Sequence, residues 1–261
     1  MRSILIQTGR DDGMTARLDT AMNIARASDG HLTLLIDTPV GRYVTVDPYG
    51  GSYVAREALD DALAQDDALA ATFADRLKAD DVPFDVVQYE TEPLAAMADA
   101  ARLADLVIVS RGCGYCGDLA LESRAPVLAV PDGKPLDLPL RAAAIAWDGG
   151  LEAAHAMRAA VPLLRDCPAV TVITVAKERN GDFPATEALR YLSRHGIKAD
   201  LAELAKANSV EETIAGEVRA RGAQLLVMGA YSHSRVREFL FGGVTRYFLD
   251  DAAAPPLLIA H

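Results

Sequence analysis

Short apolar runs alternate with amphipathic segments along the chain, and the whole alternation occurs twice. Each half opens on an apolar strand, predicted at 3–8 and at 142–147. A helical pattern follows each strand, because apolar residues recur three and four positions apart. These residues are Met14, Leu18, Ala21 and Ala25 in the first half, and Ala153, Met157, Val161 and Leu164 in the second. The pattern indicates two copies of one unit.

The remaining elements also correspond between the halves. Further strands are predicted at 31–36, 84–89, 104–109 and 126–130, and at 169–175, 198–204, 223–228 and 256–260. The second helices carry Leu59, Leu63, Leu69, Phe73 and Leu77 in the first half, and Leu189 and Leu192 in the second. The third helices start near Thr91 and Pro93 and at Ser209, where Ser209 and Glu212 are typical of a capping box.

Strands that alternate with helices of this length predict parallel β-α-β units whose apolar strands are covered on both faces. The fold class is therefore α/β, with two tandem doubly wound, Rossmann-like domains of roughly five parallel strands each. Domains are predicted at 1–132 and 140–261, joined by a linker at 133–139.

Residues 39–53 are predicted to form a structureless loop, because Gly41, Pro48, Gly50 and Gly51 interrupt any regular pattern. The loop also contains three tyrosines, which are Tyr43, Tyr49 and Tyr53. Two interpretations stay open, a variable surface insertion or a cover for a cleft or a partner.

Composition narrows the class of protein. The chain has 261 residues with 37 acidic and 26 basic side chains, so its formal net charge is -11. A surface of that sign repels phosphate backbones and anionic lipid, and we expect neither a nucleic-acid nor a membrane partner. No apolar run has the length of a membrane span or of a signal-peptide core. Three cysteines are unsuited to a secreted disulfide framework, so a cytoplasmic location is expected.

The turn after the fourth strand of the second half has the composition of an anion site. Ligands of open α/β sheets bind beyond the carboxyl ends of the strands, near the point where the strand order reverses. Here the turn holds the small residues Gly229, Ser232, Gly242 and Gly243, which let main-chain amides approach an anion closely. A helix with Val244, Tyr247 and Phe248 follows, and its N-terminal amides would point at the same place.

This turn resembles the universal stress protein family. ATP-binding members of that family carry glycine, two residues, glycine, nine residues, and then glycine followed by serine or threonine. The present chain keeps the spacing from Gly229 through Ser232 to Gly242. It departs from the pattern at Ser232, which replaces the second glycine, and at Gly243, which replaces the hydroxyl residue. The resemblance covers the chain as two tandem copies with the adenine-nucleotide α-hydrolase-like fold.

The resemblance implies a regulatory protein of the stress response that binds ATP or a related adenine nucleotide, with at most slow hydrolysis. It also implies that the two domains pack as an internal pseudo-dimer, and it leaves open whether the chain forms a homodimer and whether Mg²⁺ accompanies the nucleotide. Asp148 matches an aspartate that faces the adenosine, and Val175 matches a position that packs on adenine. The implied nucleotide contacts are Trp147, Asp148, Val175, Met228, Gly229, Ser232, His233, Arg235, Gly242, Gly243, Val244 and Thr245.

Several of these contacts have a second interpretation. Thr245 is a candidate to supply the hydroxyl that Gly243 lacks. His233, Arg235, Arg237 and Arg246 are either phosphate ligands or a solvated helical face. Asp148 is either a nucleotide contact or the N-cap of the following helix, and both roles can coexist. A structural or interaction protein that has lost nucleotide binding is the alternative function.

The first half lacks the same apparatus. In the second half, 27 positions separate Gly229, at the end of the fourth strand, from Pro256, the proline before the fifth strand. In the first half, only 16 positions separate the equivalent residues, Ser110 and Pro126. The nine-residue spacer and its helix are not expected to fit there in the same form, and Gly9 occupies the place of Asp148. We therefore expect no ATP binding of the family type in this half. The whole excess of acidic residues lies in 1–139, so the second half is electrically neutral.

Cys113 and Cys116 lie in the shortened turn of the first half. A pair with this spacing is a redox dithiol, half of a metal site, or two inert thiols. No second cysteine pair with this spacing and no paired histidines exist to complete a zinc site, and the five histidines are dispersed. A thiol-based redox sensor is therefore a further alternative function.

Overall fold

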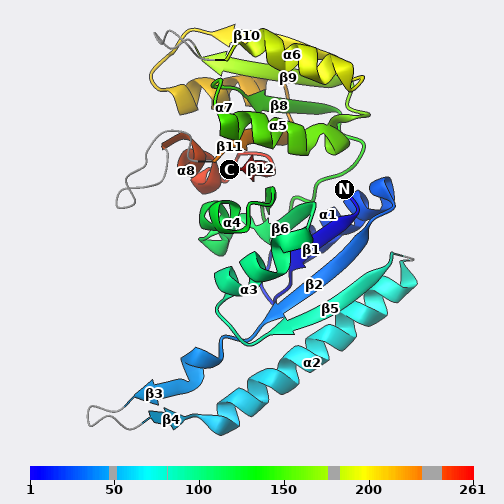
Figure 1. Cartoon of the computed structure of the whole chain (residues 1–261), viewed down its shortest axis with the longest axis vertical. Helices are drawn as coiled ribbons and strands as arrows, with labels where there is room; N and C mark the ends of the chain where they lie inside the picture. Colours follow the sequence, from blue (N-terminus) through cyan, green and yellow to red (C-terminus); the bar gives the residue numbers. More distant parts are fainter. Residues whose placement is uncertain (47–51, 81, 176–182, 231–242) are drawn as a thin grey trace.

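The computed structural model describes residues 1–46, 52–80, 82–175, 183–230 and 243–261. Ten strands form one continuous sheet in the order β10-β9-β8-β11-β12-β7-β6-β1-β2-β5 (Figure 1). Each half of the chain contributes five neighbouring strands, all parallel within that half. The α/β class and the five strands per half are confirmed.

The first half contributes β1 (Ser3–Gln7), β2 (His31–Asp37), β5 (Phe84–Tyr89), β6 (Leu106–Ser110) and β7 (Val127–Val130). Its helices are α1 (Met14–Ser28), α2 (Arg56–Ala79), α3 (Pro93–Ala100) and α4 (Cys116–Ser123), and η3 (Arg111–Cys113) precedes α4. Pro93 stands in the first turn of α3, where its missing N–H costs nothing. The short 3-10 helix η2 (Ala101–Leu103) leads from α3 towards β6.

The second half repeats this order. Its strands are β8 (Ala142–Ala146), β9 (Ala169–Val175), β10 (Ala199–Leu204), β11 (Leu225–Gly229) and β12 (Leu257–Ala260). Its helices are α5 (Leu151–Leu164), α6 (Ala185–Arg194), α7 (Val210–Ala220) and α8 (Gly243–Asp250). The Ser209 side chain accepts a hydrogen bond from the N–H of Glu212 at 3.1 Å, so the predicted cap of α7 is confirmed.

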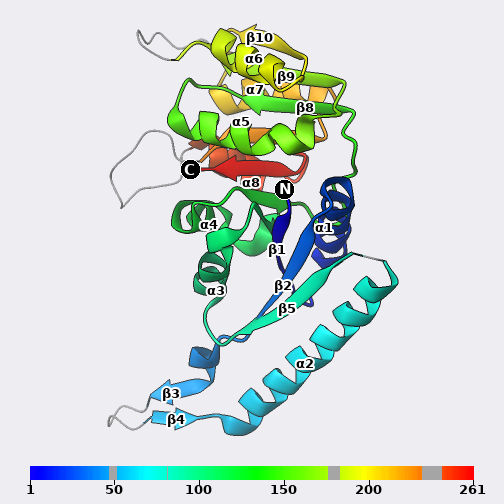
Figure 2. The ribbon, with the colours of Figure 1, turned by 45° about the vertical axis from the view of Figure 1, so that its right-hand side comes forward.

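The two halves meet edge to edge through their last strands. β7 and β12 pair antiparallel, with Leu257 opposite Ala129 and Ile259 opposite Val127. Both strands are completely buried, so the join lies in the middle of the sheet and not at an exposed edge. Figure 2 shows the C-terminal strand lying between the two halves.

Two apolar layers cover the two faces of the sheet, and each layer extends over both halves. One layer contains Leu18 and Leu77 from the first half together with Met157 and Leu192 from the second. The other contains Met97 and Leu119 together with Val218 and Phe248. The pattern follows from doubly wound topology, in which helices pack on both faces of a parallel sheet.

The prediction of a structureless loop at 39–53 is wrong for the described part of that segment. It contains the 3-10 helix η1 (Val40–Tyr43) and the hairpin strands β3 (Val44–Val46) and β4 (Ser52–Val54). Together with the first turns of α2, the hairpin extends away from the main sheet (Figures 1 and 2). Only Phe73 and Leu77 of α2 are buried, so just the C-terminal part of that helix packs on the core.

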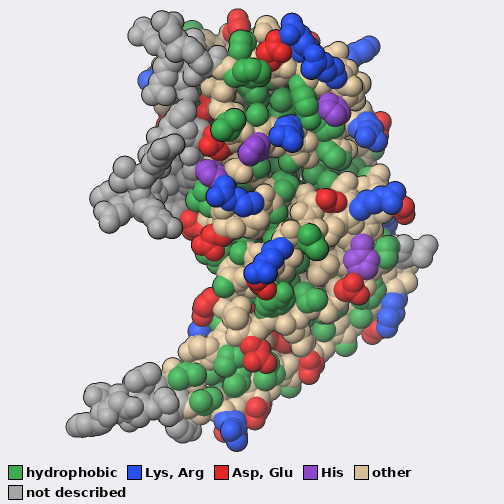
Figure 3. Space-filling model, in the orientation of Figure 1, with side chains coloured by type: hydrophobic (Ala, Val, Ile, Leu, Met, Phe, Trp, Pro, Cys, Tyr) green, Lys and Arg blue, Asp and Glu red, His purple; other side chains and the backbone are tan. Residues whose placement is uncertain are grey.

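Three further features bear on function. The predicted linker packs on the core: Leu136 is buried and its N–H donates to Thr20 Oγ1 at 2.9 Å. In the described segments, no helix has the length and apolar character to cross a membrane. On the face shown in Figure 3, acidic and basic side chains are interspersed and form no continuous basic patch.

Candidate functional site

The candidate site lies at the carboxyl ends of β8, β9 and β11. In the second half the chain runs from β8 outward to β9 on one side, and it later places β11 on the other side. The strand order therefore reverses between β8 and β11, which is where open α/β sheets bind ligands.

The turn after β8 positions Asp148. Trp147 continues the ladder by donating its N–H to Ile173 O at 2.8 Å, and Gly149 then adopts a φ of 80°, which favours glycine. Asp148 Oδ1 accepts the N–H of Gly150 at 2.9 Å, and Gly150, not Asp148, is the N-cap residue of α5. The alternative interpretation of Asp148 as the N-cap is therefore wrong, and its carboxylate instead closes the turn just before the helix.

Gly229 marks the closest approach between β11 and the start of α5. A Cβ built on Gly229 would lie 2.6 Å from the Ala153 nitrogen and 2.7 Å from the Glu152 carbonyl carbon. Both neighbours are backbone atoms, so they cannot move aside as the tip of a side chain can. Gly229 thus lets the first turn of α5 press directly against the end of the strand.

The first turn of α8 reaches the same point. Thr245 is buried, and its hydroxyl donates to Gly229 O at 3.4 Å. A Cβ on Gly243 would meet nothing within 4 Å, so the start of α8 is not crowded by described atoms. Val244 is half-buried and packs against the apolar layer. The Thr245 hydroxyl faces the protein in this arrangement and would reach a phosphate only by leaving Gly229.

Apolar side chains line the ends of the strands beside this point. Val175 ends β9 and Met228 precedes Gly229, and both are buried. The Trp147 indole is also buried and donates its N–H to Phe183 O at 3.1 Å. Sequence reasoning missed Phe183, which lies 57% exposed with its ring centroid 6.5 Å from that of Trp147. The signal that could have found it is its place in the sequence, because Phe183 is an aromatic residue directly before Pro184 and the start of a helix.

The remaining predicted contacts lie outside the described residues. They are Ser232, His233, Arg235 and Gly242, together with the basic residue Arg237. Arg246 is described, and its Nε lies 3.4 Å from Asp250 Oδ2, one turn further along α8. The structure thus brings together Trp147, Asp148, Val175, Met228, Gly229, Gly243, Val244 and Thr245 around one strand edge.

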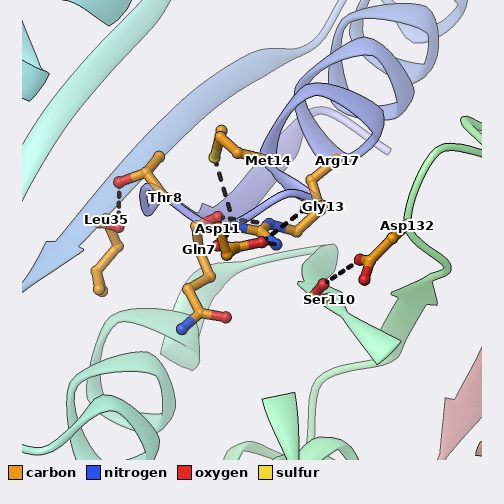
Figure 4. A network of polar contacts seen from close by, with 9 residues as sticks. All are labelled: Gln7, Thr8, Asp11, Gly13, Met14, Arg17, Leu35, Ser110 and Asp132. Atoms are coloured by element: carbon orange, nitrogen blue, oxygen red, sulfur yellow. Dashed lines mark hydrogen bonds and ion pairs between the residues drawn. The ribbon is translucent and has the colours of Figure 1, made fainter. Parts of the chain in front are cut away.

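The equivalent edge of the first half is filled by its own polar side chains (Figure 4). Arg17 is 1% exposed and makes two hydrogen bonds of 2.6 Å to Asp11, while its Nε donates to Gln7 O at 3.1 Å. The hydrogen bonds from Arg17 hold the pKa of Asp11 below its usual value. A hydrogen-bonded ion pair therefore lies directly after β1, in the turn that carries Asp148 in the other half.

Across this turn, Ser110 Oγ donates to Asp132 Oδ1 at 3.0 Å. A Cβ on Gly13 would overlap both of these side chains, so they press against the start of α1. The helix after β6 is retained as α4, whereas the spacer before it shrinks to 111–115, compared with 230–242 in the second half. The loss predicted from the sequence is thus confined to the spacer.

The Cys113 and Cys116 thiols lie in this short spacer and at the first residue of α4, with their sulfur atoms 3.2 Å apart. Within the described ranges no group of three or more His, Cys, Asp or Glu side chains has the arrangement of a metal site. The interpretation of Cys113 and Cys116 as half of a metal site therefore has no further ligands among the described residues.

Comparison with solved structures places the fold. The chain is similar to a universal stress protein from Archaeoglobus fulgidus DSM 4304, with a TM-score of 0.73 and 13% identity over 98% of this chain and 97% of the other. A functionally unknown protein from Pseudomonas aeruginosa PAO1 gives a TM-score of 0.61 and 17% identity over 99% and 92% of the two chains. For the cytoplasmic domain of a prokaryotic cation chloride cotransporter, the TM-score is 0.52 and the identity is 12%, over 99% of this chain and 95% of the other.

No protein-family model matches the chain, and no curated protein does. The likeness is therefore one of fold, and it extends across both halves. The chain has the universal stress protein fold with two such units in one polypeptide.

Proposed function

We propose that the second half binds an adenine nucleotide, with ATP as the leading candidate. In this proposal the protein acts in a stress response by binding the nucleotide rather than by catalysis. One observation carries the proposal: the first turns of α5 and α8 both contact Gly229, at the point where the strand order reverses. The first N–H groups of a helix lack partners within the helix and carry partial positive charge. Two such starts at one place form a natural site for a polyphosphate.

The neighbouring surface suits the nucleoside. Val175, Met228 and Trp147 are buried at the strand ends beside the helix starts, so they make the wall behind this point apolar, as suits a purine ring. The carboxylate of Asp148 repels phosphate and accepts hydrogen bonds, so it suits the ribose hydroxyls better than the phosphates. The half-exposed ring of Phe183 is positioned beside Trp147 to cover the base.

The equivalent strand edges of the two halves differ, and the difference supports one nucleotide per chain. In the first half, Arg17, Asp11, Ser110 and Asp132 occupy the strand edge and satisfy one another. A nucleotide would have to displace a hydrogen-bonded ion pair with a buried arginine, which is costly. The second half also carries no net charge, whereas the first half holds the whole formal excess of -11.

A second candidate function is a module that binds another protein without nucleotide. The observation that favours it is the hairpin of β3 and β4, which extends from the body with Val44 39% and Val54 43% exposed (Figure 2). Nucleotide that co-purifies with the chain would support the first candidate, and its absence after mild purification would support the second.

Isothermal titration calorimetry on the full chain tests the nucleotide proposal. ATP is titrated with and without Mg²⁺, which also shows whether the metal accompanies it. Asp148→Asn should weaken binding roughly tenfold, because the amide loses the charge and one acceptor while it retains an oxygen for Gly150. Asp166→Asn is the matched control: Asp166 is exposed after α5, at the opposite edge of the sheet, and the substitution should leave affinity unchanged.

Two results would contradict the proposal. One is the absence of heat at about 1 mM ATP, where even a weak site would be partly occupied. The other is equal weakening by both substitutions, which would place the nucleotide elsewhere or indicate a general charge effect. GTP in place of ATP tests whether the apolar surface selects adenine.

A further inference from the structure

The two thiols of the first half form a close pair. Cys113 ends η3 and Cys116 begins α4, and their Sγ atoms lie 3.2 Å apart. A disulfide requires about 2.05 Å between the sulfurs, so closing it needs a shift of roughly 1 Å. Gly112 and Gly114 flank Cys113, and a Cβ on either would meet nothing within 4 Å, so the backbone on this side has room to move.

The two thiols differ in exposure and in environment. Cys113 is half-buried, whereas Cys116 is 2% exposed. The two sulfurs share a hydrogen bond in which either thiol can be the donor, and the Cys116 thiol also lies 3.4 Å from Ser110 O and 3.6 Å from Arg111 O as a donor. The hydrogen bond with Cys116 lowers the pKa of Cys113, with smaller contributions from the neighbouring backbone and from the positive charge of Arg17. The hydrogen bond with Cys113 and burial raise the pKa of Cys116.

Cys116 belongs to one of the two apolar layers, and Cys113 and Tyr115 pack against it, but one polar group beside the pair is unsatisfied. The Tyr115 hydroxyl, between the two cysteines in sequence, is buried without a hydrogen-bond partner among the described residues. A buried hydroxyl without a partner costs free energy in the folded protein. An oxygen that oxidation adds at the neighbouring cysteines would offer this hydroxyl an acceptor.

We propose that Cys113 and Cys116 are a peroxide-reactive dithiol, in which Cys113 is attacked by the oxidant and Cys116 resolves the product. The Cys113 thiolate attacks one oxygen of hydrogen peroxide, the O–O bond breaks, and the departing hydroxide takes up a proton to form water. The Cys116 sulfur then attacks the sulfur of the Cys113 sulfenic acid. Its proton leaves with the sulfenic hydroxyl as a second water, and the S–S bond forms. Two thiols lose two electrons, and one peroxide becomes two waters.

The site is independent of the proposed nucleotide site in its chemistry, but it is connected to it through the chain. Arg111, the first residue of η3, donates to Asp251 O, Ala254 O and Pro255 O just after α8. A shift of η3 on disulfide formation therefore acts directly on the carbonyls that follow α8.

Mass spectrometry of peroxide-treated protein tests the proposal. Cys167 is buried and remote in sequence, so the Cys167→Ser chain serves as the parent and leaves only the pair. Trypsin cleaves after Arg111 and Arg124, so one peptide, 112–124, carries both cysteines. In the parent we expect this peptide to lose the mass of two hydrogen atoms and to regain it with dithiothreitol. With Cys116→Ser added, dimedone should label Cys113 as its sulfenic acid.

With Cys113→Ser added instead, Cys116 should react at least roughly tenfold more slowly, because it is buried and its thiol is not activated. Circular dichroism checks that each variant folds, and the peptide mass of the parent decides the proposal even if one variant does not. A peptide that stays reduced while N-acetylcysteine in the same tube is oxidised would overturn it. Equal reactivity of Cys113 and Cys116 would overturn the assigned roles.

Discussion

Arg17 is the largest of the fully buried side chains that the structure describes, and it lies where the other half has its candidate site. The sequence places Arg17 on a helical face beside Leu18 and Ala21, and nothing in the pattern shows that it turns inward. Its burial depends on Asp11, which is six positions earlier and adopts the turn that brings its carboxylate to the guanidinium. Tertiary geometry sets such a contact, so the sequence does not predict it. For this edge of the first half, only the shortened spacer and the lack of a residue equivalent to Asp148 were predictable.

The pair gives a directional prediction. Asp11→Ala leaves a permanently charged guanidinium buried without its counterion, and we expect it to lower the free energy of unfolding by about 3 kcal/mol. Arg17→Met should cost about 1 kcal/mol, because methionine refills the space and the half-exposed Asp11 carboxylate is then solvated. Urea unfolding of the two variants measures the difference. A larger loss for Arg17→Met would contradict the account.

The same pair predicts a dependence on pH. Because Arg17 lowers the pKa of folded Asp11, the stabilisation is fully present above the pKa of the unfolded carboxyl and is lost as the pH falls through the lower folded value. The difference in stability between the wild-type chain and Asp11→Ala should therefore shrink in acid. Unfolding midpoints between about pH 2 and 6 test this, and a difference that grows in acid would have the wrong sign.

At the scale of elements, periodicity was sufficient for the ten strands of the main sheet and for α1, α2, α3, α5, α6, α7 and α8, whereas α4 in the shortened turn of the first half was not predicted. Ser209 and Glu212 mark the start of α7 where the structure places it, because a capping box acts within a few residues. The hairpin of β3 and β4 was missed since its strands are three residues each, and glycines and prolines interrupt the segment. The close backbone approach at Gly229 was predictable because a small residue stood there in the sequence, but Phe183 is brought to Trp147 only by the path of the chain.

Gly229 tests how closely α5 must approach β11. Gly229→Ala places a methyl group within 3 Å of the backbone of Glu152 and Ala153, so α5 must move away from the strand. We expect a loss of about 1–3 kcal/mol in stability and weaker ATP binding. Gly216→Ala, at an exposed position of α7, is the matched control, since its Cβ meets nothing and alanine favours helix, with an expected gain of about 0.5–1 kcal/mol. Similar losses in both variants would refute the packing argument.

At the scale of the molecule, the antiparallel pairing of β7 with β12 turns two units into one sheet. No local pattern predicts this join, because both strands look like any buried parallel strand. Arg111 reinforces it from the short spacer of the first half: it is 8% exposed, and its guanidinium donates to Asp251 O, Ala254 O and Pro255 O at 2.7–2.8 Å. The cation also complements the carboxyl end of α8.

Because the planar guanidinium of Arg111 donates to three carbonyls, we expect replacements of Arg111 to lower stability by an amount that depends on the shape of the new side chain. Arg111→Met leaves buried carbonyls without their donor and should reduce the free energy of unfolding by about 3 kcal/mol. Arg111→Lys keeps the charge but not the planar fork, so it should recover only part of that loss. Thermal unfolding of both variants measures the effect, and full stability of Arg111→Met would show that the arginine is not a support between the halves.

The central claim is that the two halves share a fold but differ in their sites: the edge of the second is built for a nucleotide, and that of the first is filled by Arg17 and Asp11. Equilibrium dialysis of the full chain against saturating radiolabelled ATP counts bound nucleotides directly. The account predicts one ATP per chain. Two per chain would show that the ion pair of the first half yields to the ligand, and none would show that the second half does not bind ATP.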